Sequence, residues 1–200
     1  ADQTTDYRNR NRLEFTLGTA DLMYGGVYSV TVFNPSPGGG ASNVVTFTVN
    51  NPVPTISELS HVTVPAGSAD VTLVVTGTSF ALGEGHAVLR WSEDELDTTV
   101  SSRTRLTATI PASQLAAAGL YTLTVRNPGP GGGVSNQLFI TVENRVPAIT
   151  SVSADSATAG DPTFTLVVTG TGFATGSDHA ALRWNGEDRD LFAVRGILAR

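Results

Sequence analysis

The chain repeats itself with a period of 93 residues, and this repeat limits its possible folds more than any other feature. The segment 34–43 returns as 127–136, with the pattern Asn-Pro-x-Pro-Gly-Gly-Gly-x-Ser-Asn in both copies. Residues 71–91 return as 164–184, with 15 of 21 positions identical. Separate blocks that share one spacing without a gap indicate repeated structural units rather than a biased composition.

The register of the repeat divides the chain into three parts. Residues 51–143 form one complete unit, residues 1–50 match only its second half, and residues 144–200 match only its first half. The junctions at 50–54 and 143–147 are short and contain proline. We therefore expect stiff linkers and neighbouring units that stack end to end.

Within the complete unit, apolar and polar residues alternate in short runs between turn signals, as in strands with one buried face. The pattern predicts about one helical turn at 112–118 and strands at 55–60, 71–77, 87–91, 98–102, 106–110, 121–125 and 138–142. Seven short strands without a regular helix predict an all-β, Ig-like sandwich. Trp91 is expected to fill the core, and Tyr121 resembles the tyrosine corner of such sandwiches.

The residues after the two tryptophans predict hairpin turns. Asn185-Gly186 directly follows Trp184, and Asn-Gly is a strong signal for a two-residue turn between antiparallel strands. Ser92-Glu93 holds the same place in the complete unit and is a weaker turn sequence.

Five motifs occur in a fixed order along the repeat. They are Pro-x-Ile at 54–56, Val-Thr-Gly-Thr-x-Phe at 75–80, Arg-Trp-Asn-Gly at 183–186 (aligned with 90–93), Ala-Gly-x-Tyr-x-Leu-Thr-Val at 118–125, and the Gly-rich loop at 127–136. This set resembles the IPT/TIG domain, the immunoglobulin-like module of plexins, some transcription factors and many bacterial surface proteins. The resemblance implies an early-set Ig fold and, for tandem copies, an extracellular bacterial array. It implies no catalytic residues.

Charge and composition exclude several classes of partner. The net charge is −6, so the chain would repel a phosphate backbone, and we expect no nucleic-acid partner. There is no cysteine, which excludes disulfides and thiolate metal sites. No apolar run approaches the ~20 residues that a membrane-spanning helix needs.

Two repeated features raise the question of ligand binding. The Gly-rich loops at 36–40 and 129–133 lack the lysine and the following helix of a phosphate-binding loop, so we predict structural hairpin loops. His86 and His179 lie one period apart in separate units, about 30–40 Å from each other at ~3.3 Å per strand residue. They are predicted to be strand-edge residues rather than metal ligands.

Acidic residues also cluster once in each unit. Glu93-Asp94-Glu95 with Asp97 recurs as Glu187-Asp188 with Asp190. Calcium needs six to eight converging oxygens, and the Asp-x-Asp-x-Asp-Gly spacing is absent, so solvated hairpin tips are the preferred interpretation and calcium binding stays open. No Ser/His/Asp set recurs, and we expect no catalytic, cofactor-binding or metal-ligating residues and no enzymatic activity.

Residues 1–50 and residues 144–200 each match only half of a unit, which raises the question of what completes them. A half sandwich of about 50 residues would expose its inner face and unpaired strand edges. Further chain could complete each half, or residues 144–200 of one molecule could pair with residues 1–50 of the next to give a head-to-tail filament. A composite would hold a redundant segment, because 188–200 and 1–13 align with about the same stretch. Closure within one chain is disfavoured by the short linkers.

These expectations combine into a prediction of function. The chain is predicted to be a non-enzymatic extracellular structural protein, an Ig-like array that forms a surface stalk or filament. Its partners would be further repeats or other copies of itself. The alternative is an adhesion or carbohydrate-binding module with a surface glycan or protein ligand, which would display aromatic side chains on a loop or sheet face.

Overall fold

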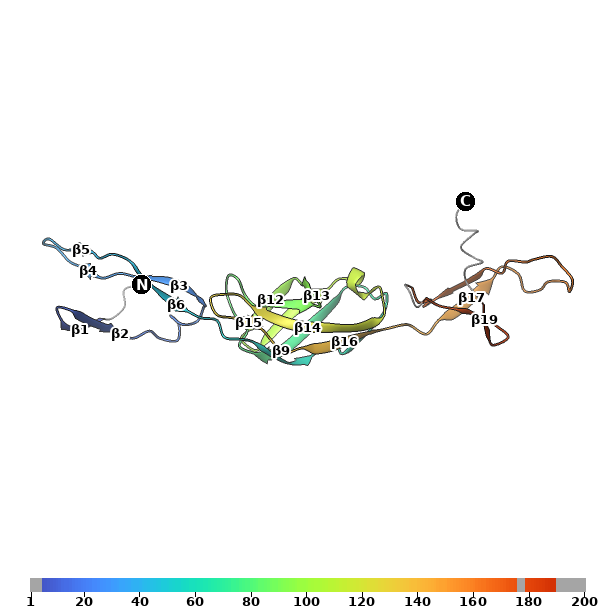
Figure 1. Ribbon diagram of the computed structural model, residues 1–200, viewed down its shortest axis with the longest axis horizontal. Coiled ribbons are helices and arrows are strands. Elements are labelled where there is room, and N and C mark those ends of the chain that lie inside the picture. The colour runs from blue at the N-terminus through green and yellow to red at the C-terminus, as the bar shows by residue number, and fades with distance from the viewer. Residues whose placement is uncertain (1–4, 176–178, 190–200) are drawn as a thin grey trace. The chain divides into compact units, whose positions relative to one another are not determined.

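The computed structural model describes residues 5–175 and 179–189, and these residues form β-strands and connecting loops almost throughout. One short 3-10 helix, η1 (Ala112–Leu115), is the only helix in the described part of the chain. Figure 1 shows the strands coloured by their position in the sequence, from blue at the N-terminus to red at the C-terminus. The expected all-β fold class is therefore confirmed.

The first sheet of the middle part has four strands. In spatial order they are β12 (Thr98–Ser102), β13 (Arg105–Ile110), β9 (Val71–Thr78) and β7 (Thr55–Leu59). The outer pairs are antiparallel, with Val100 opposite Leu106 and Ile56 opposite Gly77. Strands β7 and β9 come from the first half of the unit and strands β12 and β13 from the second, so the two halves meet in the middle of this sheet.

The second sheet of the middle part has six strands. Its main order is β11 (Asp94–Glu95), β10 (Val88–Trp91), β14 (Gly119–Asn127), β16 (Leu138–Glu143) and β8 (Thr63–Pro65), with β15 (Gly133–Val134) paired to β14. Strand β10 is antiparallel to β14, with Arg90 opposite Thr124. Strand β8 is parallel to β16. The halves of the unit meet in this sheet as well, where β10 adjoins β14.

Alternation along the strands directs one set of side chains from both sheets into a common core. Trp91 is 1% exposed and is the largest fully buried side chain, as predicted. The other large side chains that are fully buried are Phe80, Leu73, Leu89, Leu106, Ile110, Leu115, Leu123, Ile140, Val75, Val125 and Val142. The inward faces expected from the sequence are thus the faces that are buried.

Seven of these strands overlap the seven predicted ones, but β8, β11 and β15 were not predicted. Strands of two or three residues are too short to show an alternating pattern, so the sequence indicated loops at these places. Asp94 and Glu95 were expected in a hairpin tip. Instead they pair with β10, with Asp94 opposite Trp91, and only Ser92-Glu93 remains in the turn.

The segment between β13 and β14 carries two expected features. The helical turn is present as η1 but is shorter than predicted, and the Ala112 amide donates to Asp70 Oδ1 at 2.8 Å. The Tyr121 hydroxyl donates to the Ala117 carbonyl oxygen at 3.0 Å, which confirms the tyrosine corner.

The N-terminal part consists of three antiparallel strand pairs. They are β1 (Thr5–Asn9) with β2 (Arg12–Phe15), β3 (Gly26–Val30) with β6 (Val45–Val49), and β4 (Phe33–Asn34) with β5 (Gly40–Ala41). Each of these pairs forms a separate two-stranded sheet.

The C-terminal part consists of two antiparallel strand pairs. They are β17 (Ala148–Val152) with β18 (Val168–Thr171), and β19 (Leu182–Trp184) with β20 (Glu187–Arg189). Trp184 lies opposite Glu187, so Asn185 and Gly186 form the predicted two-residue turn. Their φ angles of 51° and 84° are the positive values that such a turn needs.

Candidate functional site

The Gly-rich loop between β14 and β15 holds the segment that leads into the middle sandwich. The Asn51 amide donates to the Pro130 carbonyl oxygen at 2.8 Å, and the Gly132 amide donates to the Asn51 carbonyl oxygen at 2.7 Å. Asn51 Nδ2 also donates to the Pro128 carbonyl oxygen at 3.0 Å. The expected hairpin loop is confirmed, and its main-chain groups bind Asn51.

Replacing Gly132 by alanine is expected to loosen this loop. Gly132 has a φ of +70°, and a Cβ atom there would collide with the carbonyl oxygens of Asn127 and Pro128. We expect the free energy of unfolding to fall by about 1–3 kcal/mol, the cost of one strained backbone position, measured by urea denaturation. Gly129→Ala is the matched control, because a Cβ at Gly129 meets no atom within 4 Å. Equal losses in the two variants would contradict the strained fit of Gly132 in this loop.

The two repeated histidines lie in different surroundings. His86 lies two residues before β10, and its Nδ1 is 2.9 Å from the Ala87 carbonyl oxygen. His179 is exposed. Across residues 5–175 and 179–189, no group of three His, Cys, Asp or Glu side chains could hold a metal ion.

The acidic clusters lie at the ends of hairpins and form surface ion pairs. Glu93 pairs with Arg90 at 3.0 Å, and Glu95 pairs with Arg126 at 2.8 Å. In the C-terminal part, Asp188 pairs with Arg183 at 2.6 Å, while Asp190 lies outside the described residues. Exposed pairs of this kind contribute little to stability, and the carboxylates lie against arginines rather than around a common centre.

Apolar side chains of the N-terminal part are exposed at positions that are buried in the complete unit. Leu13, Phe15 and Phe47 are 40%, 44% and 46% exposed, whereas the residues 93 positions later are at most 3% exposed. Leu22 is exposed in the same way, and its counterpart Leu115 is fully buried. We call Leu13, Phe15, Leu22 and Phe47 the N-terminal open face.

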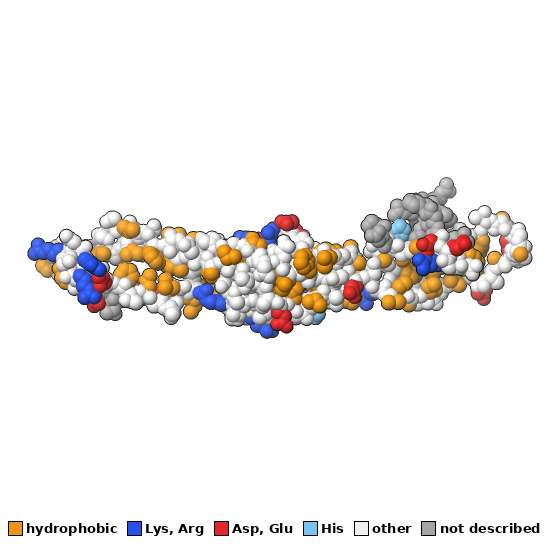
Figure 2. Space-filling view, turned by 60° about the horizontal axis from the view of Figure 1, so that its bottom comes forward, with side chains coloured by type: hydrophobic (Ala, Val, Ile, Leu, Met, Phe, Trp, Pro, Cys, Tyr) orange, Lys and Arg blue, Asp and Glu red, His pale blue; other side chains and the backbone are white. Residues whose placement is uncertain are grey.

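The C-terminal part shows the same contrast from the other half of the unit. Trp184 is 58% exposed where Trp91 is 1% exposed, and Ile149 is 65% exposed where Ile56 is 3% exposed. Val152 and Phe173 are also exposed, with buried counterparts. We call Ile149, Val152, Phe173 and Trp184 the C-terminal open face. Figure 2 shows hydrophobic side chains on the visible surface of both terminal parts.

The C-terminal open face borders a groove. The groove has a volume of about 550 Å³, and its lining is Val152, Ala154, Asp155, Ser156, Ala157, Phe164, Leu166, Leu182 and Trp184. In the complete unit, the positions that correspond to Val152, Leu182 and Trp184 lie in the core. The groove therefore occupies the place that the second half of a sandwich fills.

The strand edges beside the two open faces also lack a pairing strand among the described residues. In the middle sandwich, β14 adjoins β10 and β13 adjoins β9. The corresponding strands of the terminal parts are β3, β19, β2 and β18, and each pairs with only one other strand among the described residues. Both terminal parts therefore present unpaired main-chain groups beside an apolar face, which is an arrangement that favours strand addition.

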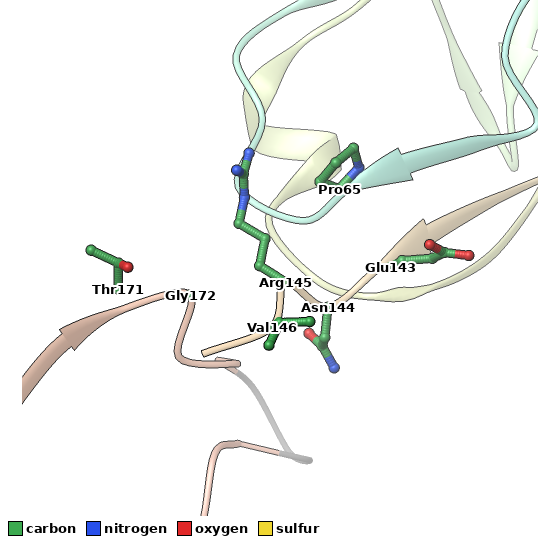
Figure 3. Close-up of a pocket in the computed structure, with 7 residues that line it drawn as sticks. All are labelled: Pro65, Glu143, Asn144, Arg145, Val146, Thr171 and Gly172. Atoms are coloured by element: carbon green, nitrogen blue, oxygen red, sulfur yellow. The ribbon is translucent and has the colours of Figure 1, made fainter. Parts of the chain in front are cut away.

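A second hollow lies at the end of β16. Its volume is about 380 Å³, and Figure 3 shows its lining: Pro65, Glu143, Asn144, Arg145, Val146, Thr171 and Gly172. Arg145 Nε donates to the Ala66 carbonyl oxygen at 2.9 Å, so the guanidinium is held by main chain. Glu143 is the one carboxylate in the lining, and the lining contains no histidine, serine or cysteine.

The sequence located the open faces but missed how the Gly-rich loop is used. The phase of the repeat predicted that each half unit would expose its inner face and unpaired strand edges. The binding of Asn51 by the loop was not predicted, because main-chain hydrogen bonds leave no pattern in the side chains. The one available signal was that asparagine recurs at the corresponding junction position, Asn144.

Comparison with known proteins identifies the domain type of the middle part. Residues 54–142 match the family model of the IPT/TIG domain, which confirms the expected domain and agrees with its Ig-like sandwich. No curated protein matches the chain. Within the described residues, no helix is long and apolar enough to cross a membrane.

Proposed function

We propose that the chain is a non-enzymatic structural protein, a tandem array of Ig-like units with a 93-residue period whose two half units are completed by the missing half of a sandwich. The observation that carries this proposal is the contrast between Trp184 and Trp91, which have equivalent sequence surroundings and opposite exposure. Exposed apolar faces of this kind mark association sites in soluble proteins. The proposal includes an extracellular location at the cell surface. This part of it is based on the resemblance to tandem IPT/TIG domains of bacterial surface proteins.

Strand registers support the repeat. Tyr7 lies opposite Leu13, as Val100 lies opposite Leu106 exactly one period later in the sequence. In the C-terminal part, Ile149 lies opposite Gly170, as Ile56 lies opposite Gly77. The terminal parts thus have the strand pairing of the corresponding halves of the middle sandwich.

Side-chain hydrogen bonds support the repeat in the same way. The Tyr28 hydroxyl donates to the Tyr24 carbonyl oxygen at 2.9 Å, as Tyr121 does to Ala117. Ser42 Oγ accepts from the Val32 amide, and the serine one period later, Ser135, makes the same bond. Ser153 Oγ accepts from the Val167 amide, as its own counterpart one period earlier does.

The adhesion alternative receives less support. A carbohydrate-binding surface usually needs aromatic side chains that stand free of the core, and Phe139 is the one large aromatic that is exposed among the described residues 51–143. Most exposed aromatics instead belong to the terminal parts, where several correspond to core positions. Saturable hits on a glycan array would favour the adhesion alternative over a purely structural role.

A lengthened chain tests the proposed array. A copy of residues 94–143 is placed after Gly186 in a Trp91→Phe background, so that Trp184 is the only tryptophan. We expect its fluorescence emission to shift to shorter wavelength and its quenching by acrylamide to fall, because the added half would bury it. The matched control carries the same added copy with aspartate at the positions of Leu106 and Ile140. An unchanged Trp184 signal in both chains would contradict the array.

A further inference from the structure

We propose that the half that completes each open face comes from a second copy of this chain, so that the N-terminal part of one copy and the C-terminal part of another form a composite sandwich. This inference rests on the proposed function, since it names the partner of the same faces. The middle sandwich is the template for the contact, because its two halves already meet along both sheets.

The template specifies the strand pairing of the composite. In the middle sandwich, Arg90 lies opposite Thr124, and Trp91 lies opposite Leu123. The residues one period away place Arg183 of one copy opposite Thr31 of another, with Trp184 opposite Val30. Strand β19 then adds along residues 30–32, at the end of β3 and just after it, and main-chain hydrogen bonds between the two copies satisfy groups that each copy leaves open.

The apolar surface is large enough for a specific contact. The eight side chains of the two open faces expose roughly 700 Å² together, since a large side chain presents about 150–250 Å² when free. Small specific interfaces bury about 1,200 Å² in total, so these side chains supply more than half before the strand edges and the groove are counted. A contact of this size is sufficient for association between copies.

Two asparagines give the contact its polar specificity. In the middle sandwich, Asn136 Oδ1 accepts from the Ile56 amide at 3.0 Å, and its Nδ2 donates to the Ile56 carbonyl oxygen at 2.9 Å. One period earlier, Asn43 is exposed, and its side chain has no hydrogen-bond partner among the described residues. In the composite, Asn43 would bind the main chain of Ile149 of the other copy in the same two-bond arrangement.

The second asparagine is Asn127, which is 2% exposed and joins three main-chain groups of the middle sandwich. Its Oδ1 accepts from the Ala81 amide, and its Nδ2 donates to the carbonyl oxygens of Pro52 and Ser79. Its counterpart Asn34 is exposed. The template places Asn34 against the main chain of Arg145, Gly172 and Ala174 of the other copy.

A second copy is favoured as the occupant because this one chain carries both complementary faces. Copies can therefore complete each other without a third component, and a head-to-tail contact of unlike faces continues into an open fibre. Strand β1 already pairs with β2 in the register of β12 and β13. Residues 188–200 and residues 1–13 align with about the same stretch of the complete unit. At this position the N-terminal part thus supplies its own strand, β1.

Disulfide trapping of the whole chain tests the proposed register. The chain has no cysteine, so Thr31→Cys and Arg183→Cys can be made as single variants, mixed and oxidised. Facing residues of an antiparallel pair have Cα atoms about 4.5–5.5 Å apart, within reach of a disulfide. We expect a cross-linked dimer. Ser29→Cys mixed with Arg183→Cys is the control for register, because diagonal neighbours lie about 7–8 Å apart, and we expect at least fivefold less product.

Sedimentation velocity tests the contact without cross-linking. We expect the mass of the wild-type chain to rise with concentration above the 20.8 kDa of one copy. Asn43→Ala is expected to weaken association about tenfold, the effect of losing two hydrogen bonds. Asn136→Ala is the matched control, which should lower the stability of the middle sandwich and leave association unchanged. Val27→Ala should change neither, because the residue one period later, Leu120, is exposed in the complete unit.

The outcomes separate this inference from the proposed function. If the chain stays monomeric at all concentrations and no cross-link forms, the proposal that a second copy completes the open faces is wrong. It is also wrong if a chain that carries both Thr31→Cys and Arg183→Cys forms the disulfide within itself. If Trp184 in the lengthened chain is nevertheless buried, the array stands and its halves are completed by another chain segment. If Trp184 also stays exposed there, the array itself fails.

Discussion

Replacing Trp91 by alanine is expected to lower the free energy of unfolding of the middle sandwich by about 3–5 kcal/mol, the range for a large aromatic removed from a core. Trp91 is 1% exposed and lies on β10 of the six-stranded sheet. At about 4–8 °C per kcal/mol for a domain of this size, the Tm would fall by more than ~12 °C. Scanning calorimetry, with hydrogen exchange of the β9 and β14 amides, measures the loss.

Trp184→Ala is the matched control for this variant. Trp184 follows the same Leu-Arg sequence as Trp91 but is 58% exposed, so its removal should leave the unfolding of the middle sandwich unchanged within about 0.5 kcal/mol. A loss in the Trp91 variant no larger than in the Trp184 variant would contradict the central place of Trp91 in the core.

In the middle sandwich, the strands that the sequence predicted are at least four residues long, and in several of them burial alternates. In β9, Leu73 and Val75 are fully buried and alternate with more exposed positions, and this alternation is directly readable. Strands β8, β11 and β15 were missed because their formation depends on partners distant in the sequence. Strand β8, for example, has its parallel partner β16 more than 70 residues away.

The same difference separates the predicted and unpredicted parts of the candidate site. The open faces follow from a sequence comparison, because Trp184 repeats Trp91 while residues 144–200 match only the first half of the unit. The roles of Asn127 and Asn136 could not be predicted from the sequence, since each binds main-chain groups of residues about 46–80 positions away in the chain. In the sequence they were only members of a loop motif.

The positions of these asparagines explain how the two halves of a unit hold together. Asn136 belongs to the second half and binds Ile56 of the first, and Asn127 likewise binds Ser79 and Ala81 of the first half. Apolar packing alone is non-directional. Buried hydrogen bonds of fixed geometry select one register between the halves, and a composite of two copies would need the same selection.

Asn127→Ala is expected to lower the free energy of unfolding of the middle sandwich by about 3 kcal/mol or more. The substitution removes three hydrogen bonds of about 1 kcal/mol each and leaves main-chain groups of Pro52, Ser79 and the buried Ala81 without this partner. Urea denaturation followed by Trp91 fluorescence in a Trp184→Phe background measures the change in the middle sandwich alone.

Asn34→Ala is the control at the equivalent position. Asn34 is exposed, so its loss should not change the stability of the middle sandwich, whereas it should weaken association between copies. Asn127→Ala should have the opposite profile, with a large loss of stability because its hydrogen bonds lie within one chain. If both variants destabilised the middle sandwich equally, or if Asn127→Ala cost less than about 1 kcal/mol, the asparagine would not be the polar link between the halves that its geometry indicates.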